Sequence, residues 1–293
     1  MIVLLWVLGS FTLLYLVTIT LIAFASVRPL RIPQFISPSQ LGLPQERVEI
    51  DSEGHNLRGW WVRHPDAELV VIALHGYINN RCELAPYALP FFRERCSSLF
   101  MDFRAQGRST GKKCTFGHKE RADVRAMVEY VRREQPGVRI VLFGSSMGAA
   151  AAALAAGDEP SIADALILDG VYRSLDEASG GWWTMIGGQW LQIVLTPVAW
   201  IGMLYLGFRP RTISVEKALA KLAGKPMLFL QGTDDPLVPR ASAEANLRAA
   251  GEFARIAWFE GAGHGHGRFQ DSIRFENEIV DFLRNVRDSA QKG

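Results

Sequence analysis

The sequence predicts an α/β protein with a mostly parallel, doubly wound sheet, and two observations lead to this fold class. Short apolar runs of strand character alternate along the chain with segments of helical periodicity. Such alternation is typical of a parallel sheet with helices on both faces. In addition, one strand runs directly into Gly144-Ser145-Ser146-Met147-Gly148, and an alanine-rich helix follows at once. This G-x-S-x-G pattern is a sharp strand-to-helix turn that lifts its middle serine clear of the backbone.

The expected strands combine apolar and β-branched residues and end at turn signals. They lie at 47–50, 57–62, 69–74, 98–103, the run before Gly144, 163–168, 226–230 and 255–259. The first two are expected to pair antiparallel across the turn at 51–54. Helices are expected at 82–95 (interrupted by its prolines), 119–133, after Gly148, 241–250 and 273–286.

The N-terminal segment 1–27 contains no charged side chain. A helix of about 25 residues is roughly 37 Å long, which is enough to cross a hydrocarbon core of about 30 Å. A cleaved signal peptide is the alternative, because Ala23-Phe24-Ala25 resembles a cleavage site. The apolar run is long for a signal peptide, however, and no basic residue precedes it. We expect a single-pass transmembrane anchor, and the arginines that follow it, Arg28 and Arg31, favour a folded domain in the cytoplasm.

Residues 28–45 are rich in proline and are expected to form a linker to a domain at 46–293. The net charge of +2 gives no reason to expect a nucleic-acid partner. Three cysteines cannot all pair and lack metal-ligand spacing, so free thiols are expected and no metal site is predicted. They are Cys82, Cys96 and Cys114.

Five motifs occur in an order that is more specific than any one of them. They are His75-Gly76, the run Asp102 to Ser109, the G-x-S-x-G turn, Gly232 to Pro239 with Asp235 inside it, and Gly261-Ala-Gly-His264. In this order they resemble the α/β-hydrolase superfamily, in its serine-aminopeptidase-like and monoglyceride-lipase-like branch. The resemblance covers about 48–288 and implies the α/β-hydrolase fold. One departure is Ala105, where the family pattern usually has glycine.

Serine needs a base to attack at neutral pH, and that base needs an orienting acid. The order serine, acid, histidine is the one that this fold uses. Ser146 is the expected nucleophile rather than its neighbour Ser145. His264 is the expected base, because the family match stops there, and His266 is the alternative.

For the acid, the resemblance favours Asp235. Asp234 would point elsewhere in the turn, and an Asx turn is the ordinary use of an aspartate beside proline. Asp169, at the end of the preceding strand, stays open as a second possible acid, because some relatives place the acid there.

The oxyanion hole needs two backbone N–H donors. Met147 is expected to supply one by its position at the start of the helix, and the resemblance implies Tyr77 for the other. Charged residues of the neighbouring loop are expected to be structural. They are Asp102, Arg104 and Glu120.

A lid is expected at about 172–222, and within it 178–208 contains no charged side chain but four tryptophans. A membrane crossing here would separate two strands of one sheet and is therefore excluded. Two alternatives are left: a lid whose apolar face is internal, or a lid whose surface dips into the membrane. We expect an apolar acyl pocket partly exposed to lipid, with Trp182 and Trp183 at that surface.

The sequence thus predicts a membrane-anchored serine hydrolase that needs no cofactor and cleaves an ester, thioester or related acyl bond. Its expected partners are a small acyl substrate and membrane lipid. One alternative is a serine peptidase, although the lid offers no acidic residue between 178 and 208 to hold a substrate amine. Another is a catalytically silent interaction module tethered to the membrane.

Overall fold

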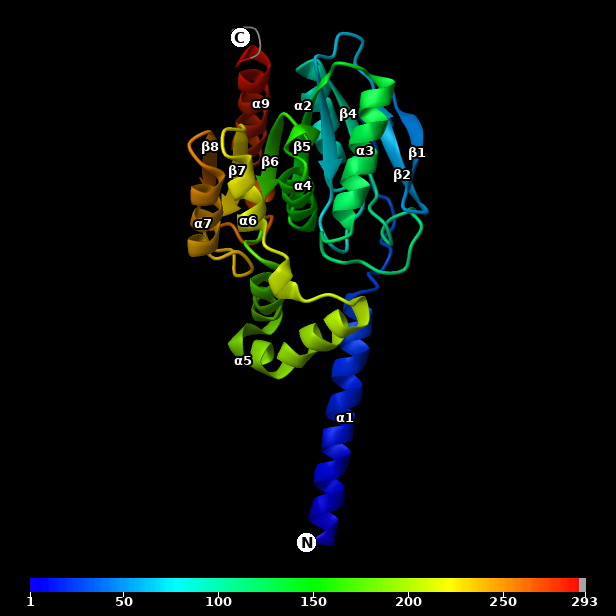
Figure 1. Ribbon diagram of the computed structural model, residues 1–293, viewed down its shortest axis with the longest axis vertical. Helices are drawn as coiled ribbons and strands as arrows, with labels where there is room; N and C mark the ends of the chain where they lie inside the picture. Colours follow the sequence, from blue (N-terminus) through cyan, green and yellow to red (C-terminus); the bar gives the residue numbers. More distant parts are fainter. Residues whose placement is uncertain (290–293) are drawn as a thin grey trace.

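The computed structural model describes residues 1–289, and an eight-stranded sheet forms its centre (Figure 1). The strands are β1 (Glu46–Ser52), β2 (His55–Val62), β3 (Leu69–Leu74), β4 (Cys96–Met101), β5 (Arg139–Ser145), β6 (Ala165–Asp169), β7 (Met227–Gly232) and β8 (Ala254–Phe259). Their order is β1-β2-β4-β3-β5-β6-β7-β8. β2 pairs antiparallel with both β1 and β4, whereas the strands from β3 to β8 are parallel. The predicted α/β-hydrolase fold is confirmed.

Helices cover both faces of the sheet because the central strands are apolar on both sides. In β3, Val70 and Ile72 belong to one core, whereas Val71 and Ala73 belong to the other. The first core contains α3 (Glu120–Glu134), α4 (Met147–Asp158), α6 (Val215–Leu219) and α7 (Arg240–Ala250). The second contains α2 (Ala88–Arg93) and α9 (Ser272–Ser289). This alternation follows from the two-residue repeat of a strand.

Short 3-10 helices complete the connections between these elements. They are η1 (Pro38–Leu41), η2 (Ala85–Tyr87), η3 (Pro160–Ile162), η4 (Pro210–Thr212) and η5 (Ala220–Leu222). The helix expected at 82–95 is therefore only η2 followed by α2, as its prolines suggested. The strand expected at 98–103 lies two residues earlier. Asp102 falls just past its end, where its side chain accepts the N–H of Arg81 from the loop after β3 and the N–H of Arg108 from the loop that follows.

Ala105, the departure from the family pattern, lies in that loop and has a backbone φ of 63°. An alanine is strained in this left-handed region, where glycine is not. The loop keeps its shape through neighbouring buried charges. Arg104 pairs with Asp123, and Glu120 accepts hydrogen bonds from the backbone of Thr115 and Gly117.

The segment between β6 and β7 holds α5 (Leu175–Leu206), which is two helices joined at a break. Gly187 and Gly188 have non-helical backbone angles, and Gly188 has a φ of 79°. An isolated bridge pairs Ser174 with Ser214, so α5 leaves and returns at the same end of the sheet. Because β6 and β7 are adjacent and parallel, the crossover to the start of β7 is made after α5, through α6. α5 lies beyond the carboxyl ends of the strands, as Figure 1 shows.

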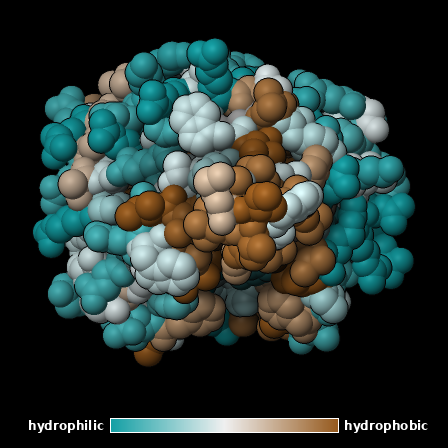
Figure 2. All heavy atoms as spheres, turned by 90° about the horizontal axis from the view of Figure 1, so that it is seen from below, coloured by the Kyte–Doolittle hydropathy of each residue, from teal (hydrophilic) through white to brown (hydrophobic). Residues whose placement is uncertain are grey.

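The helix α1 (Ile2–Ser26) projects from the same side of the molecule, and its upper end lies against α5 (Figure 1). Among residues 1–289, α1 and α5 are the two helices long and apolar enough to cross a membrane by length and composition. Most of α1 is exposed, whereas α5 is held at both ends by neighbouring strands. Figure 2 shows that apolar side chains gather on this face of the molecule.

Candidate active site

The turn between β5 and α4 holds Ser146 in a conformation that few residues adopt. Its backbone φ is 49° and its ψ is −111°. A Cβ at Gly144 would lie 2.4 Å from Ala149, and one at Gly148 would lie 2.1 Å from the carbonyl oxygen of Leu74. Both glycines are therefore required for the close approach of strand and helix. Strain of this kind persists where the surrounding structure imposes it, as at active sites.

Three side chains from three different loops form a continuous chain of hydrogen bonds. The Oγ of Ser146 lies 2.8 Å from Nε2 of His264. The Nδ1 of His264 lies 2.8 Å from Oδ2 of Asp235. If Nδ1 carries the proton and donates it to Asp235, Nε2 is free to accept the proton of the serine. The structure thus brings together the three residues that the sequence analysis selected.

Asp235 is fully buried, yet both its oxygens have partners. Its Oδ1 accepts the backbone N–H groups of Leu237 and Val238, each at 2.9 Å. Its Oδ2 accepts the side-chain amide of Gln231 at 2.9 Å in addition to the histidine. The Asx turn considered as an alternative use of this aspartate is therefore present as well. It fixes the carboxylate in place, and the second oxygen remains available to His264.

The environment of His264 favours its protonated form. Burial alone would lower the pKa of the imidazole, but the hydrogen bond and negative charge of Asp235 outweigh it. The pKa of His264 is consequently raised above its ordinary value of 6.5. A base that holds a proton more strongly takes one more readily from a hydroxyl group in the attacking step.

The alternative residues lie elsewhere. His266 is exposed and precedes the short helix α8 (Gly267–Gln270). Asp234 is exposed, and its Oδ1 accepts a hydrogen bond from Thr233. Asp169 pairs with Arg268 rather than with His264. Ser145 is buried, and its hydroxyl donates to Glu83 at 2.8 Å.

A buried ionic cluster behind the serine was not anticipated from the sequence. Arg268 of α8 contacts Glu83, Asp169 and Ser145. Burial alone would lower the pKa of Arg268, but the two carboxylates raise it, so the guanidinium stays charged. The cluster joins the loop after β3, the ends of β5 and β6, and the loop that carries His264. No local motif marks it, because its members are spread over 83–268.

The same cluster positions the loop expected to complete an oxyanion hole. The carboxylate of Glu83 accepts the N–H of Gly76 at 2.6 Å, directly before Tyr77. His75 closes this turn, because its Nδ1 lies 2.8 Å from the carbonyl oxygen of Gly76 and its Nε2 accepts the N–H of Phe103. Tyr77 and Met147 both line the cavity beside Ser146. Among residues 1–289, neither of their N–H groups donates a hydrogen bond to another protein group.

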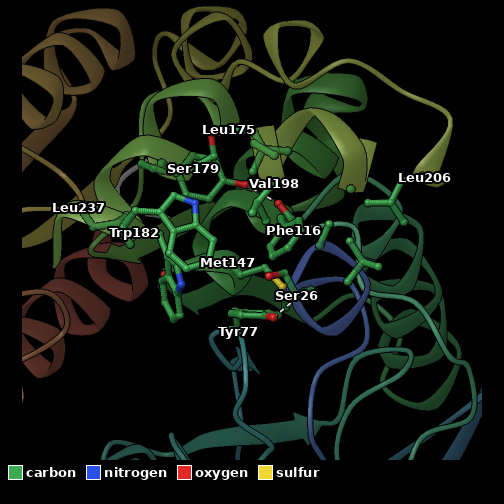
Figure 3. A pocket seen from close by; sticks show the side chains of 18 of the residues that line it. Ser26, Tyr77, Phe116, Met147, Leu175, Ser179, Trp182, Val198, Leu206 and Leu237 are labelled. Carbon is green, nitrogen blue, oxygen red and sulfur yellow. Dashed lines mark hydrogen bonds between the residues drawn. The ribbon is translucent and has the colours of Figure 1, made fainter. Parts of the chain in front are cut away.

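A cavity of about 120 Å³ begins at Ser146 and extends under α5 (Figure 3). A single water needs only about 10–15 Å³, so a short acyl chain has room. None of the described side chains that line the cavity is charged. Trp182 and Met147 both line the cavity (Figure 3), and the ring of Trp182 packs against that of Tyr77.

The four tryptophans of α5 fall into an inner and an outer pair. Trp182 and Trp183 are half-buried and line the cavity, so they are not the residues most exposed on the lid. Trp190 and Trp200 are each 65% exposed and lie on the outer surface of α5. Trp182 and Trp183 thus lie at the pocket, as expected, but the larger exposed surface belongs to Trp190 and Trp200, which the sequence analysis did not single out. No hydrophobic periodicity in α5 distinguishes the two pairs.

Comparison with known proteins agrees with this fold. The family model described as "Serine aminopeptidase, S33" matches residues 65–201, and that described as "TAP-like protein" matches 196–292. A solved structure of an esterase from Pyrococcus furiosus superposes with a TM-score of 0.74 at 26% identity, over 89% of this chain and 98% of that one. The chain belongs to the α/β-hydrolase superfamily.

Two relatives of this α/β hydrolase match it over most of the chain. "Uncharacterized protein YqkD" of Bacillus subtilis is 26% identical over 81% of this chain and 78% of its own length. "Alpha/beta hydrolase domain-containing protein WAV2" of Arabidopsis thaliana is 26% identical over 70% of this chain and 66% of its own. With the esterase, these similarities support hydrolase activity for the chain.

Proposed function

We propose that this α/β hydrolase is a membrane-anchored serine hydrolase that cleaves an ester, thioester or related acyl bond of an apolar substrate. The observation that carries the proposal is the hydrogen-bonded chain from Asp235 through His264 to Ser146, which ends at an apolar cavity. A nucleophile, a base and an orienting acid are what acyl transfer requires.

In the proposed mechanism, the Oγ of Ser146 attacks the acyl carbon while His264 takes its proton. The N–H groups of Tyr77 and Met147 stabilise the negative oxygen that forms. His264 then passes the proton to the leaving group, and an acyl-enzyme remains. Water, deprotonated by the same histidine, attacks the acyl-enzyme and releases the acid, and the proton returns to Ser146.

One observation favours an anchor that is retained over a cleaved signal peptide. Ile19 and Ala23 are buried against the rest of the protein, although most of α1 is exposed. They share a small core with Leu195 and Val198 of α5. Cleavage near Ala25 would remove both residues and with them part of the domain's own packing, which a disposable segment would not provide.

The runner-up function is a serine peptidase, which the description of the matching family model suggests. An aminopeptidase must bind the ammonium group of its substrate, and a carboxylate is the usual partner for it. No carboxylate belongs to the described cavity lining. The cavity therefore favours an apolar acyl group over an amino-terminal residue.

The proposed function is tested with two sets of substrates. One is nitrophenyl esters whose acyl chains have two to sixteen carbons, and the other is amides of amino acids that have a free amino terminus. The unmodified protein should hydrolyse the esters, and Ser146→Ala should lower kcat by about 10⁶-fold. Ser161→Ala removes a hydroxyl from the exposed surface and should leave activity unchanged. Faster cleavage of the amides would favour the peptidase, and equal activity of Ser146→Ala would contradict the mechanism.

A further inference from the structure

One wall of the cavity comes from α1, the helix that the sequence marks only as an anchor. Ala23, Ser26 and Val27 line the cavity together with Ser146. Ile19, Ala23 and Val27 are spaced four residues apart, so they form one stripe of the helix. They are 2%, 1% and 2% exposed, in a helix that is otherwise largely open to its surroundings.

The second half of α5 supplies the partner for this stripe. Leu195 and Val198 are buried in the same small core as Ile19 and Ala23. The hydroxyl group of Tyr15 also donates a hydrogen bond to the carbonyl oxygen of Val194 at 2.8 Å. The two helices therefore meet along a defined seam and do not merely lie close together.

The end of α1 is also fixed to the expected oxyanion loop. The hydroxyl group of Tyr77 donates a hydrogen bond to the carbonyl oxygen of Ser26, as the dashed line in Figure 3 shows. Below this point, the rings of Phe24 and Tyr205 pack edge to face, with centroids 4.6 Å apart. The last turns of α1 are thus held against the catalytic loop on one side and against α5 on the other.

Outside the seam, both helices present large apolar side chains. Leu21 of α1 is 64% exposed, and Ile193 and Leu204 of α5 are 76% and 86% exposed. Figure 2 shows these two elements within one apolar face of the molecule. Side chains of α1 and α5 therefore line the cavity on one side and form this apolar face on the other.

We propose that the last two turns of α1 form a wall of the acyl-binding pocket, and that the acyl chain of a membrane lipid reaches Ser146 directly from the bilayer along the seam between α1 and α5. This inference rests on the proposed function, because it takes Ser146 as the nucleophile and α1 as the anchor. The chemistry fits a lipid acyl chain: the pocket lining is uncharged, one end holds the nucleophile, and one wall is the helix that lies in the hydrocarbon.

The first test uses the unmodified full-length protein in vesicles and a long-chain alkyl fluorophosphonate that carries a diazirine near the end of its chain. The Oγ of Ser146 bonds to phosphorus, fluoride leaves, and His264 takes the proton. After irradiation, mass spectrometry should find the chain linked to the peptide that contains residues 19–27. Labelling at Ser146 with crosslinks that avoid α1 would overturn this inference alone. No labelling at Ser146 would overturn the proposed function as well.

A pair of alanines two positions apart provides the matched variants. Ala23 lines the pocket, whereas Ala25 is exposed on α1. Ala23→Phe should lower kcat/KM for a twelve-carbon ester at least tenfold and spare a two-carbon ester, and Ala25→Phe should change neither. Identical chain-length profiles for the two variants would overturn the proposed wall. If Ala23→Phe does not fold, the crosslinking result decides.

The route from the bilayer is tested by where the substrate is placed. A diacyl ester that does not exchange between membranes is supplied either in the vesicles that hold the protein or in separate vesicles. Hydrolysis should be at least tenfold faster in the shared vesicles. Equal rates would contradict the proposal that the substrate enters from the bilayer. They would indicate that it reaches the pocket through water.

Discussion

At the residue scale, the central feature is that two buried aspartates have different partners. Asp169 ends β6 and Asp235 lies in the loop after β7, and both are more than nine-tenths buried. Asp235 contacts His264, whereas Asp169 contacts Arg268. The sequence analysis favoured Asp235 by the resemblance but kept Asp169 open, because some relatives place the acid at the end of that strand.

Asp235→Asn should therefore lower kcat by about 10⁴-fold, since an amide favours the wrong tautomer of the histidine. Asp169→Asn should affect stability more than kcat, because it leaves the charge of Arg268 less well compensated. Steady-state kinetics and thermal unfolding of both variants separate these effects. Full activity in Asp235→Asn together with an inactive Asp169→Asn would reassign the acid.

The raised pKa of His264 has a direct consequence for the pH profile. The base must be neutral to accept the proton of Ser146, so kcat/KM should fall as the pH drops through the pKa of His264. Because that pKa is raised, half-maximal activity should lie above pH 6.5. His266→Ala, which changes an exposed imidazole, should leave the profile in place. A profile that is flat across this range would contradict the assignment of the base.

Ser146 and His264 were predictable from the sequence because each lies in a short motif whose glycines indicate a tight turn of the backbone. The cluster of Glu83, Arg268 and Asp169 was not, because its members come from three distant segments. A charged residue taken alone is most often a surface residue. Only the fold shows that these three are buried together.

At the scale of the elements, this cluster connects the loop after β3 to the ends of β5 and β6 and to α8. Removing one charge from a buried ion pair leaves the others without a partner, which costs about 3–5 kcal/mol. Arg268→Met should thus lower the free energy of unfolding by about this amount. It should also lower kcat, since Glu83 holds the N–H of Gly76 next to Tyr77.

Denaturant unfolding and steady-state kinetics measure the two effects of Arg268→Met. The matched control is Arg248→Met, which alters an exposed arginine on α7 and should change stability by no more than about 0.5 kcal/mol. If Arg268→Met were as stable and active as Arg248→Met, the cluster would not support the site.

The strands and most helices were predictable because a sheet buried on both faces requires continuous apolar runs. The break in α5 at Gly187 and Gly188 was not predicted, although paired glycines permit it. The inner and outer tryptophans could not be distinguished either. A helix without a distinct polar face carries no pattern that tells which side it buries.

At the scale of the whole molecule, the apolar face formed by α1 and α5 accounts for the proposed attachment to the membrane. The anchor and its contact with the pocket could not both be predicted from the sequence. The length and composition of 1–27 indicate a span. Its packing against α5 depends on residues far along the chain, Leu195 and Val198.

Deleting residues 1–18 removes most of the exposed helix but keeps Ile19, Ala23 and Val27 in place. The shortened protein should still bind vesicles reversibly through α5. Burying about 200 Å² of apolar surface contributes on the order of 5 kcal/mol, at about 25 cal/mol per Å². Adding Trp190→Ser and Trp200→Ser should abolish this binding in vesicle flotation.

Phe253→Ser in the shortened protein provides the control for that experiment. Phe253 is 56% exposed but precedes β8, at the opposite edge of the sheet from α5. It should leave vesicle binding unchanged. Vesicle binding that survives the loss of both tryptophans would contradict a membrane contact through α5.

The central claim is that His264 and Asp235 activate Ser146 for covalent attack, and peptide mapping after reaction with a short alkyl fluorophosphonate tests it most directly. The reagent should add one phosphonyl group, located by mass spectrometry on Ser146, and His264→Ala should slow its addition by several orders of magnitude. An adduct on Ser145 or another residue, or an equal rate of labelling in His264→Ala, would contradict the account.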